Sequence, residues 1–268
     1  MTDHLFRHLA PISEAAWNAI DEDAKARLTV QLASRKLVDF TGPAGWEHAA
    51  VNIGRCESLA TQGSVATSRR VVLPLIEMRA RFTLPRRELD NVDRGAPDPD
   101  LSALETAAHD LALAENRTVF HGSAPAGIIG IAEASSHDPL DLDAEPDTYP
   151  SAVARAVDVL RNSGIGGPYG IAIAPELYTR ISETAEHGGY PLFDHLREIL
   201  GGPVVWAPGI DGGIVVSQRG GDFTFESGQD VSIGYLSHDA EDVELYLEES
   251  FTFRVIEPDA AIALQSSA

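Results

Sequence analysis

The stretch from Arg219 to Pro258 reads RGGDFTFESGQDVSIGYLSHDAEDVELYLEESFTFRVIEP, and it is the part of the sequence that says most about the fold. Turn-forming residues at Gly220-Gly221, Ser227-Gly228 and 237–239 divide it into short runs. Within each run apolar side chains alternate with polar ones, as in Phe223 and Phe225. Alternation with a period of two is typical of β-strands that bury one face. The same pattern continues in the other apolar residues of the stretch, which are Val231, Ile233, Tyr235, Leu245, Leu247, Phe251 and Phe253.

Composition limits the classes of function open to the chain. It has 268 residues, with 20 Lys and Arg against 41 Asp and Glu, so its formal net charge is −21. A surface this acidic repels phosphate, which argues against nucleic acid or an anionic membrane as partner. The single cysteine, Cys56, excludes an intrachain disulfide and a cysteine-based metal cluster. Without an apolar leader or membrane-length run in the sequence, we expect a cytoplasmic protein.

Two segments predict long helices. Residues 13–33 begin at Ser13, a favourable N-cap, and carry one apolar stripe. The stripe consists of Trp17, Ile20, Ala24, Leu28 and Leu32. Residues 100–120 have helical spacing as well, and Ser102 with Glu105 suggests a capping box at their start.

The segment Val71 to Leu84, VVLPLIEMRARFTL, predicts one long extended arm. Its alternate residues Ile76, Met78 and Phe82 share one face, and fourteen extended residues would span roughly 46 Å. That length exceeds an ordinary strand, and its unpaired edges would be a liability in a monomer. We therefore expect Ile76, Met78 and Phe82 to contact a neighbouring subunit.

From Ser151 onward, helical and strand-like runs alternate. Helices are expected near 151–161, from Pro175, and up to Leu200, with strands at 170–174, in PVVWA and in GIVVS. The sequence EHGGYP interrupts the helical region and predicts a loop. This pattern indicates an α/β block at residues 135–222.

The chain resembles the encapsulins, the shell proteins of bacterial and archaeal nanocompartments, which share the fold of tailed-phage major capsid proteins. The resemblance rests on an ordered set of segments that spans nearly the whole chain. They are LFRHLAPISEAAWNAID, RKLVDFTGPAGW, LPLIEMRARFTL, ELDNVDRGAPDPDL, GGPYGIAIAPELY, GGDF, GQDVSIGY and LYLEESFTFRV.

The resemblance implies an α+β capsid fold in three parts. Residues 1–46, 82–134 and 223–268 would form a peripheral domain, with 100–120 as its spine helix. Residues 47–81 would be an extended E-loop, and 135–222 an axial domain. The chain would assemble with itself into a closed icosahedral shell, with 60 subunits as the smallest form.

The resemblance also implies two sites. A groove would bind the C-terminal targeting peptide of a cargo enzyme, either a dye-decolourising peroxidase or a ferritin-like protein. Its residues would be Leu28, Leu32, Arg35 and Asp39, with Ile233 and Leu247 as neighbours. A loop of Glu186, His187, Gly188, Gly189 and Tyr190 would line a pore at the five-fold axis. From the residues alone, the 13–33 stripe favours a helix that packs only on its own domain, and the resemblance reverses this preference for the second half of the helix.

The sequence contains no recognisable catalytic motif. A Walker loop, G-x-S-x-G, H-E-x-x-H and C-x-x-C are all missing, and we expect no metal site. Some encapsulins stack a flavin on a tryptophan beside the E-L-D motif, but Arg87 occupies that position here, so we expect no flavin and no other cofactor. A phage-type capsid protein is the alternative hypothesis, and a hydrolase is the alternative from another class.

Overall fold

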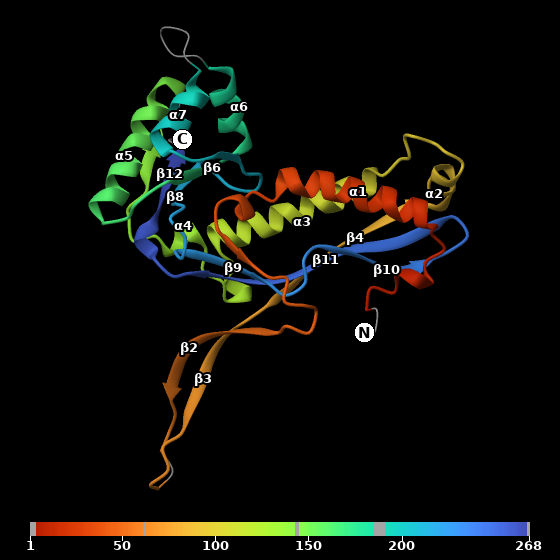
Figure 1. The fold of residues 1–268 in the computed structure, drawn as a ribbon, viewed down its shortest axis with the longest axis horizontal. Helices are drawn as coiled ribbons and strands as arrows, with labels where there is room; N and C mark the ends of the chain where they lie inside the picture. The colour runs from red at the N-terminus through yellow and green to blue at the C-terminus, as the bar shows by residue number, and fades with distance from the viewer. Residues whose placement is uncertain (1–3, 62, 143–144, 185–190, 267–268) are drawn as a thin grey trace.

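The computed structural model describes residues 4–61, 63–142, 145–184 and 191–266, arranged as two lobes and a projecting hairpin (Figure 1). The helices are α1 (Glu14–Gln31), α2 (Arg86–Asp93), α3 (Ser102–His121), α4 (Ile131–Ala134), α5 (Tyr149–Asn162), α6 (Pro175–Glu183) and α7 (Leu192–Leu200). The strands are β1 (Asp39–Thr41), β2 (Ala50–Ser58), β3 (Ser68–Pro74), β4 (Ile76–Pro85), β5 (Leu140–Leu142), β6 (Tyr169–Ile173), β7 (Val204–Trp206), β8 (Gly213–Ser217), β9 (Phe223–Ser227), β10 (Ser232–His238), β11 (Asp242–Val255) and β12 (Ala261–Ser266).

The predicted C-terminal strands form the first sheet, in the order β1-β9-β11-β10, with β4 also paired to β11. β11 is the longest member, because its first half lies between β10 and β4 while its second half pairs with β9. Alternation decides which side chains are buried, and Leu245, Leu247 and Phe251 are each 0 % exposed. The expected buried face is therefore confirmed, but on β11 the opposite face is covered as well, since Tyr246, Glu248 and Thr252 are 3 %, 1 % and 2 % exposed.

Helices α1 and α3 lie along this sheet (Figure 1). The stripe on α1 is buried as predicted, and the Ser13 hydroxyl accepts a hydrogen bond from the N–H of Ala16 at 3.1 Å, which confirms the N-cap. The capping box at Ser102 is wrong, because Ser102 is already the first helical residue of α3. Asp100 accepts from the N–H of Ser102 at 3.0 Å instead, and Glu105 pairs with Arg27 of α1.

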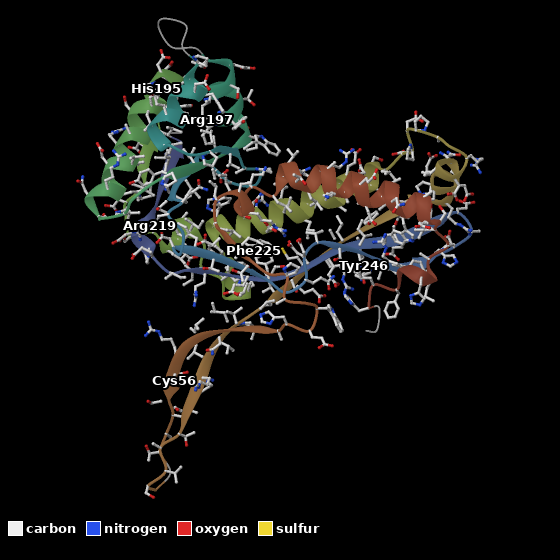
Figure 2. All side chains as sticks on the ribbon, in the orientation of Figure 1. Cys56, His195, Arg197, Arg219, Phe225 and Tyr246 are labelled. Atoms are coloured by element: carbon white, nitrogen blue, oxygen red, sulfur yellow. The ribbon has the colours of Figure 1, made fainter. Side chains whose placement is uncertain are left out.

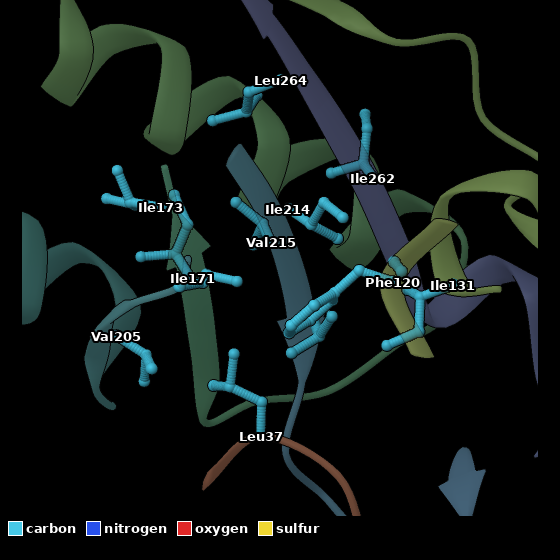
Figure 3. Close-up of a cluster of buried hydrophobic side chains, with 14 of the residues drawn as sticks. Leu37, Phe120, Ile131, Ile171, Ile173, Val205, Ile214, Val215, Ile262 and Leu264 are labelled. Carbon is cyan, nitrogen blue, oxygen red and sulfur yellow. The ribbon is translucent and has the colours of Figure 1, made fainter. Parts of the chain in front are cut away.

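The second sheet has the order β5-β12-β8-β6-β7, and α5, α6 and α7 pack around it (Figure 1). Its central strands β6 and β8 are buried along their whole length. Figure 3 shows their isoleucine and valine side chains meeting those of β12 in one apolar cluster. The helices and strands expected between Ser151 and Ser217 are all present.

The last strand corrects the predicted domain boundary. Residues 223–268 were assigned to the peripheral part, but β12 pairs antiparallel with β8 and parallel with β5 in the second sheet. Its apolar residues Ile262 and Leu264 enter that core with 1 % and 2 % exposure. The chain therefore crosses back after β11 to the lobe built on the second sheet (the axial lobe, named after the predicted axial domain), a crossing that alternation alone does not reveal.

The predicted arm is also corrected. Val71 to Leu84 is not one strand, because the chain breaks at Leu75 between β3 and β4. β4 pairs with β11 of its own chain, which places Ile76, Met78 and Phe82 opposite Phe251, Glu249 and Leu245. Phe82 is 5 % exposed and belongs to the chain's own core. The extended arm is instead the β2–β3 hairpin, which carries Cys56 away from both lobes (Figure 2).

No helix within the described ranges is long and apolar enough to cross a membrane.

Candidate functional site

A groove of about 670 Å³ lies between α1 and the edge strand β10, and we call it the α1–β10 groove. Its lining comes from the N-terminal segment, α1, the turn after α1, β10 and β11. The residues are Leu5, Arg7, Asp21, Ala24, Lys25, Leu28, Thr29, Leu32, Arg35, Lys36, Asp230, Val231, Ser232, Ile233 and Leu247. The lining combines apolar side chains with the charged side chains of Arg7, Asp21, Lys25, Arg35, Lys36 and Asp230.

Five of the six predicted docking residues meet in this groove. Leu28 comes from α1, Leu32 is the residue that caps its C-terminal end, Arg35 lies in the turn after it, Ile233 comes from β10 and Leu247 from β11. Leu28 and Leu32 are each only 7 % exposed and pack in the same cluster as Ile233 and Leu247. These four side chains are core residues whose outer edges form the base of the groove.

Asp39 does not belong to the groove, and its assignment there is wrong. It lies on β1, where its carboxylate accepts a hydrogen bond from the N–H of Gly221 at 2.6 Å. It lines a small separate recess with Gln218 and Gly220. Asp39 stabilises the turn before β9 rather than the groove.

Sequence reasoning missed the residues that are exposed in the groove. Lys25 and Thr29 lie on α1 beside the Leu28 stripe, and Leu5 comes from the N-terminal segment. The signal for Lys25 and Thr29 was available, because they lie three residues before and one after Leu28 at the border of the apolar stripe. Leu5 had no such signal, since it reaches the groove through a tertiary hydrogen bond in which its carbonyl accepts from the N–H of Tyr235 at 2.8 Å.

Arg35 is the centre of a charged network and not a solvated rim charge. Its guanidinium donates to Glu115 at 2.8 Å, to Asp230 at 2.6 Å and to Glu249 at 2.7 Å. Glu115 and Glu249 are 0 % and 1 % exposed. Removing Arg35 would leave two buried carboxylates without their cation, so its loss should destabilise the subunit strongly.

The charged network around Arg35 shifts the pKa values of its members. Burial alone would lower the pKa of Arg35, but the neighbouring carboxylates of Glu115, Glu249 and Asp230 hold it above its usual value. Burial raises the pKa of Glu249 well above its ordinary value, the Glu115 charge adds to the increase, and Arg35 offsets only part of it. The network therefore joins a buried carboxyl of raised pKa to an arginine whose pKa is also raised.

Asn116 of α3 fixes the end of α1 that carries Arg35. Its side-chain oxygen accepts from the N–H groups of Ala33 and Ser34 at 3.0 and 3.2 Å. Its amide nitrogen donates to the carbonyls of Gln31 and Pro208 at 2.9 and 3.0 Å. A 0 % exposed amide that makes four hydrogen bonds is satisfied completely, so this contact is rigid.

The β2–β3 hairpin is a second candidate site. It forms a two-stranded sheet of its own, and most of its residues are exposed. Large apolar side chains stand in solvent at Leu59, Val65 and Val72, which are 45 %, 64 % and 46 % exposed. An isolated hairpin is marginally stable in water, so we expect this one to pack against the surface of a partner.

The other predicted sites provide less evidence about function. Glu186, His187, Gly188, Gly189 and Tyr190 lie outside the described residues. Arg87 stands on α2 with its side chain 82 % exposed and its Nε 3.2 Å from the Glu88 carboxylate. Within the described part of the chain, no group of three or more His, Cys, Asp or Glu side chains could hold a metal ion.

Comparison with known structures defines the class of protein. A virus-like particle from Pyrococcus furiosus superposes with a TM-score of 0.63 at 20 % identity, over 93 % of this chain and 99 % of the other. The capsid of Myoviridae phage XM1 gives 0.53 at 9 % identity, over 86 % and 90 %. The chain therefore has the α+β fold of tailed-phage major capsid proteins, as expected from the sequence.

Sequence comparison narrows the class to one family. The family model described as encapsulating protein for peroxidase matches residues 1–252. A type 1 encapsulin shell protein of Rhodospirillum rubrum is 48 % identical, over 97 % of this chain and 96 % of its own length. The chain belongs to the encapsulin shell proteins, whose role is structural.

Proposed function

We propose that the protein assembles with itself into an icosahedral shell of 60 subunits, inside the cytoplasm, through the β2–β3 hairpin. The observation that carries this is the hairpin itself, which exposes apolar side chains and pairs with neither of the two larger sheets of its own chain. A neighbouring subunit would cover these residues, and repetition of one heterologous contact around closed symmetry axes gives a finite shell.

We further propose that the shell encloses a cargo enzyme, held by a C-terminal targeting peptide in the α1–β10 groove. Support comes from the apolar residues Leu28, Leu32, Ile233 and Leu247, which line the groove together with several charged side chains. A groove of this kind suits a short peptide whose apolar side chains enter pockets. Of the two cargo classes, the family description favours a peroxidase over a ferritin-like protein.

Glu186 to Tyr190 remains our proposal for the pore at the five-fold axis. Its test is deletion of Glu186 to Gly189, which should speed entry of a small substrate to an enclosed enzyme and leave the shells intact. Equal entry rates in both shells would exclude a gate in this loop.

One purification tests assembly and cargo together. The protein is isolated from its own cells, its particles are imaged by electron microscopy, and co-purifying proteins are identified by mass spectrometry. We expect closed particles and one dominant enzyme whose C-terminal truncation abolishes loading. A single chain of 28.7 kDa on size exclusion would overturn the shell, and enzyme that loads without its C-terminus would overturn docking in the groove.

A further inference from the structure

The distribution of lysine singles out the α1–β10 groove. The chain has 20 basic residues, but only two are lysines, Lys25 and Lys36, and both line this groove. Every other cation is an arginine. Lysine presents a mobile, compact positive charge, whereas arginine is suited to fixed bidentate pairs. The groove therefore holds the two most adaptable cations of a chain whose net charge is −21.

The two lysines are also the cations of the groove that remain without a carboxylate. Arg7 pairs with Asp21 at 2.7 Å, and Arg35 is neutralised by its three acidic partners. Among the described residues, no carboxylate lies within ion-pair distance of Lys25 or Lys36. The Lys36 ammonium donates only to the carbonyl of Val30, at 2.9 Å, and burial lowers its pKa. A ligand carboxylate would supply the ion-pair partner that each of these two ammonium groups lacks.

The backbone of β10 offers a second attachment. The N–H of Tyr235 points away from β11, because it donates to the carbonyl of Leu5. Since N–H and C=O groups alternate sides along a strand, those of Ile233 face the same outer edge. In the described chain no group outside the β10–β11 ladder bonds them. Leu5 thus already bonds the outer edge of β10 at Tyr235. The next outward-facing backbone groups on this edge, those of Ile233, are available to a ligand.

We infer that the groove binds its cargo peptide as an added strand along β10, with a peptide carboxylate against Lys25 or Lys36. The inference rests on the proposed docking function and specifies the chemistry of the partner. The peptide would exchange hydrogen bonds with Ile233 where Leu5 ends and place alternate apolar side chains over Leu28 and Leu32. From Asp21 to Leu32 the α1 wall is about 16 Å long, which holds about five extended residues.

Zero-length cross-linking tests the carboxylate. A carbodiimide condenses a carboxylate with a lysine amine to an amide and takes up the water lost as its own urea. Treatment of cargo-loaded shells should join Lys25 or Lys36 to an acidic residue in the last residues of the cargo, as read by mass spectrometry. Acetylation by an amine-reactive ester should modify both lysines in empty shells and should spare the contacted lysine in loaded ones. Full acetylation of both in loaded shells would overturn the contact.

Affinity measurements on intact empty shells supply the matched control. The probe is the synthetic C-terminal peptide of the co-purified cargo. Lys25→Gln should weaken its binding about three- to fivefold, with a smaller dependence on salt. Lys25→Arg should restore most of the binding. Arg155→Gln removes the same charge from the exposed side of α5 and should change nothing. Equal losses in Lys25→Gln and Arg155→Gln would reduce the effect to overall charge and overturn the contact.

Hydrogen exchange tests the added strand. The Ile233 amide should exchange at least tenfold more slowly when the same peptide is bound, while the Gly234 amide, which faces β11, should not change. An unprotected Ile233 with peptide bound in the groove would overturn strand addition and leave the docking proposal intact. Absence of any cargo, or binding unaffected by groove variants, would instead remove the docking proposal on which the inference depends.

Discussion

Leu28 shows how one side chain can belong to the core and to a binding surface. It packs with Ile233 and Leu247 and is only 7 % exposed, yet its outer edge lines the groove. An aspartate at this position would therefore disrupt folding before it could test docking, because burying a carboxylate without a partner is costly. Exposed lining residues such as Lys25 are better probes of cargo binding.

The first prediction concerns the burial of Leu28. Leu28→Ala should destabilise the chain by about 2 to 4 kcal/mol, because it removes packed methyl groups and leaves a cavity. Val30→Ala on the same helix is the control, since Val30 is 58 % exposed and its loss should stay within about 0.5 kcal/mol. Chemical denaturation of both variants measures the difference. Equal midpoints would show that Leu28 is not part of the core.

The second prediction concerns Glu249 and pH. A carboxyl whose pKa is raised by folding stabilises the native state while it is protonated, and that contribution is lost as pH rises through the raised pKa. Wild-type melting temperature should therefore fall as pH increases from the ordinary glutamate range through this raised pKa. Glu249→Gln keeps the shape without the charge and should flatten that decline.

Melting curves recorded at a series of pH values check this prediction. Glu226→Gln on β9 is the control, because the half-buried Glu226 lies outside the Arg35 network and its replacement should leave the decline in place. If Glu249→Gln lowers the melting temperature equally at every pH, then Glu249 is ionised and its bond to Arg35 is the stabilising feature.

At the scale of elements, the β2–β3 hairpin and β4 replace the single extended arm predicted for residues 71–84. The hairpin projects from the subunit, and β4 belongs to the subunit's core. β4 is held along its whole length by β11, whereas the hairpin pairs only with itself. A charge introduced on β4 would therefore disrupt the subunit's own core, and a charge introduced on the hairpin would act on assembly.

The third prediction contrasts two aspartate substitutions in these elements. Val72→Asp, at a position 46 % exposed, should leave a folded subunit that forms few or no shells. Phe82→Asp, at a position 5 % exposed, should give an insoluble or unfolded chain. Circular dichroism reports the fold and electron microscopy the particles. Normal shells from the Val72→Asp variant would exclude this part of the hairpin from the subunit contact.

At the scale of the whole molecule, β12 ties the end of the chain to the axial lobe. It lies between β5 and β8, and Ala261, Ile262 and Leu264 are 0–2 % exposed. The first and second sheets are thus joined by the segment after β11 as well as by the segment before β9. Damage to this strand should affect the axial core, although the strand follows the peripheral β11 in sequence.

The fourth prediction tests this link. Ile262→Asp should abolish soluble expression, because it buries a charge in the core shown in Figure 3. Gln265→Asp, on the same strand but exposed, should express normally. Soluble yield and melting temperature provide the measurement. Comparable yields from both variants would show that β12 contributes little to the axial core.

The sequence by itself determined the elements and the family. Alternation in 223–255 defined strands with a buried face, and the stripe on α1 defined its inner side, because these periods follow directly from backbone geometry. The ordered motifs from residue 5 to residue 255 indicated the capsid fold. They also pointed to six docking residues, five of which meet in the groove.

Only the tertiary structure decided how these elements are paired. A two-faced strand such as β4 has the same alternating sequence pattern whether it pairs with β11 or with another subunit, because strand pairing uses backbone groups common to all residues. The apolar stripe of α1 is the same in sequence whether its outer edge meets solvent or a peptide. The sequence therefore does not show that Leu28 both packs in the core and lines the groove. Arg35 depends on Glu115, Asp230 and Glu249, which lie 80 to 214 residues away and are brought to it by folding alone.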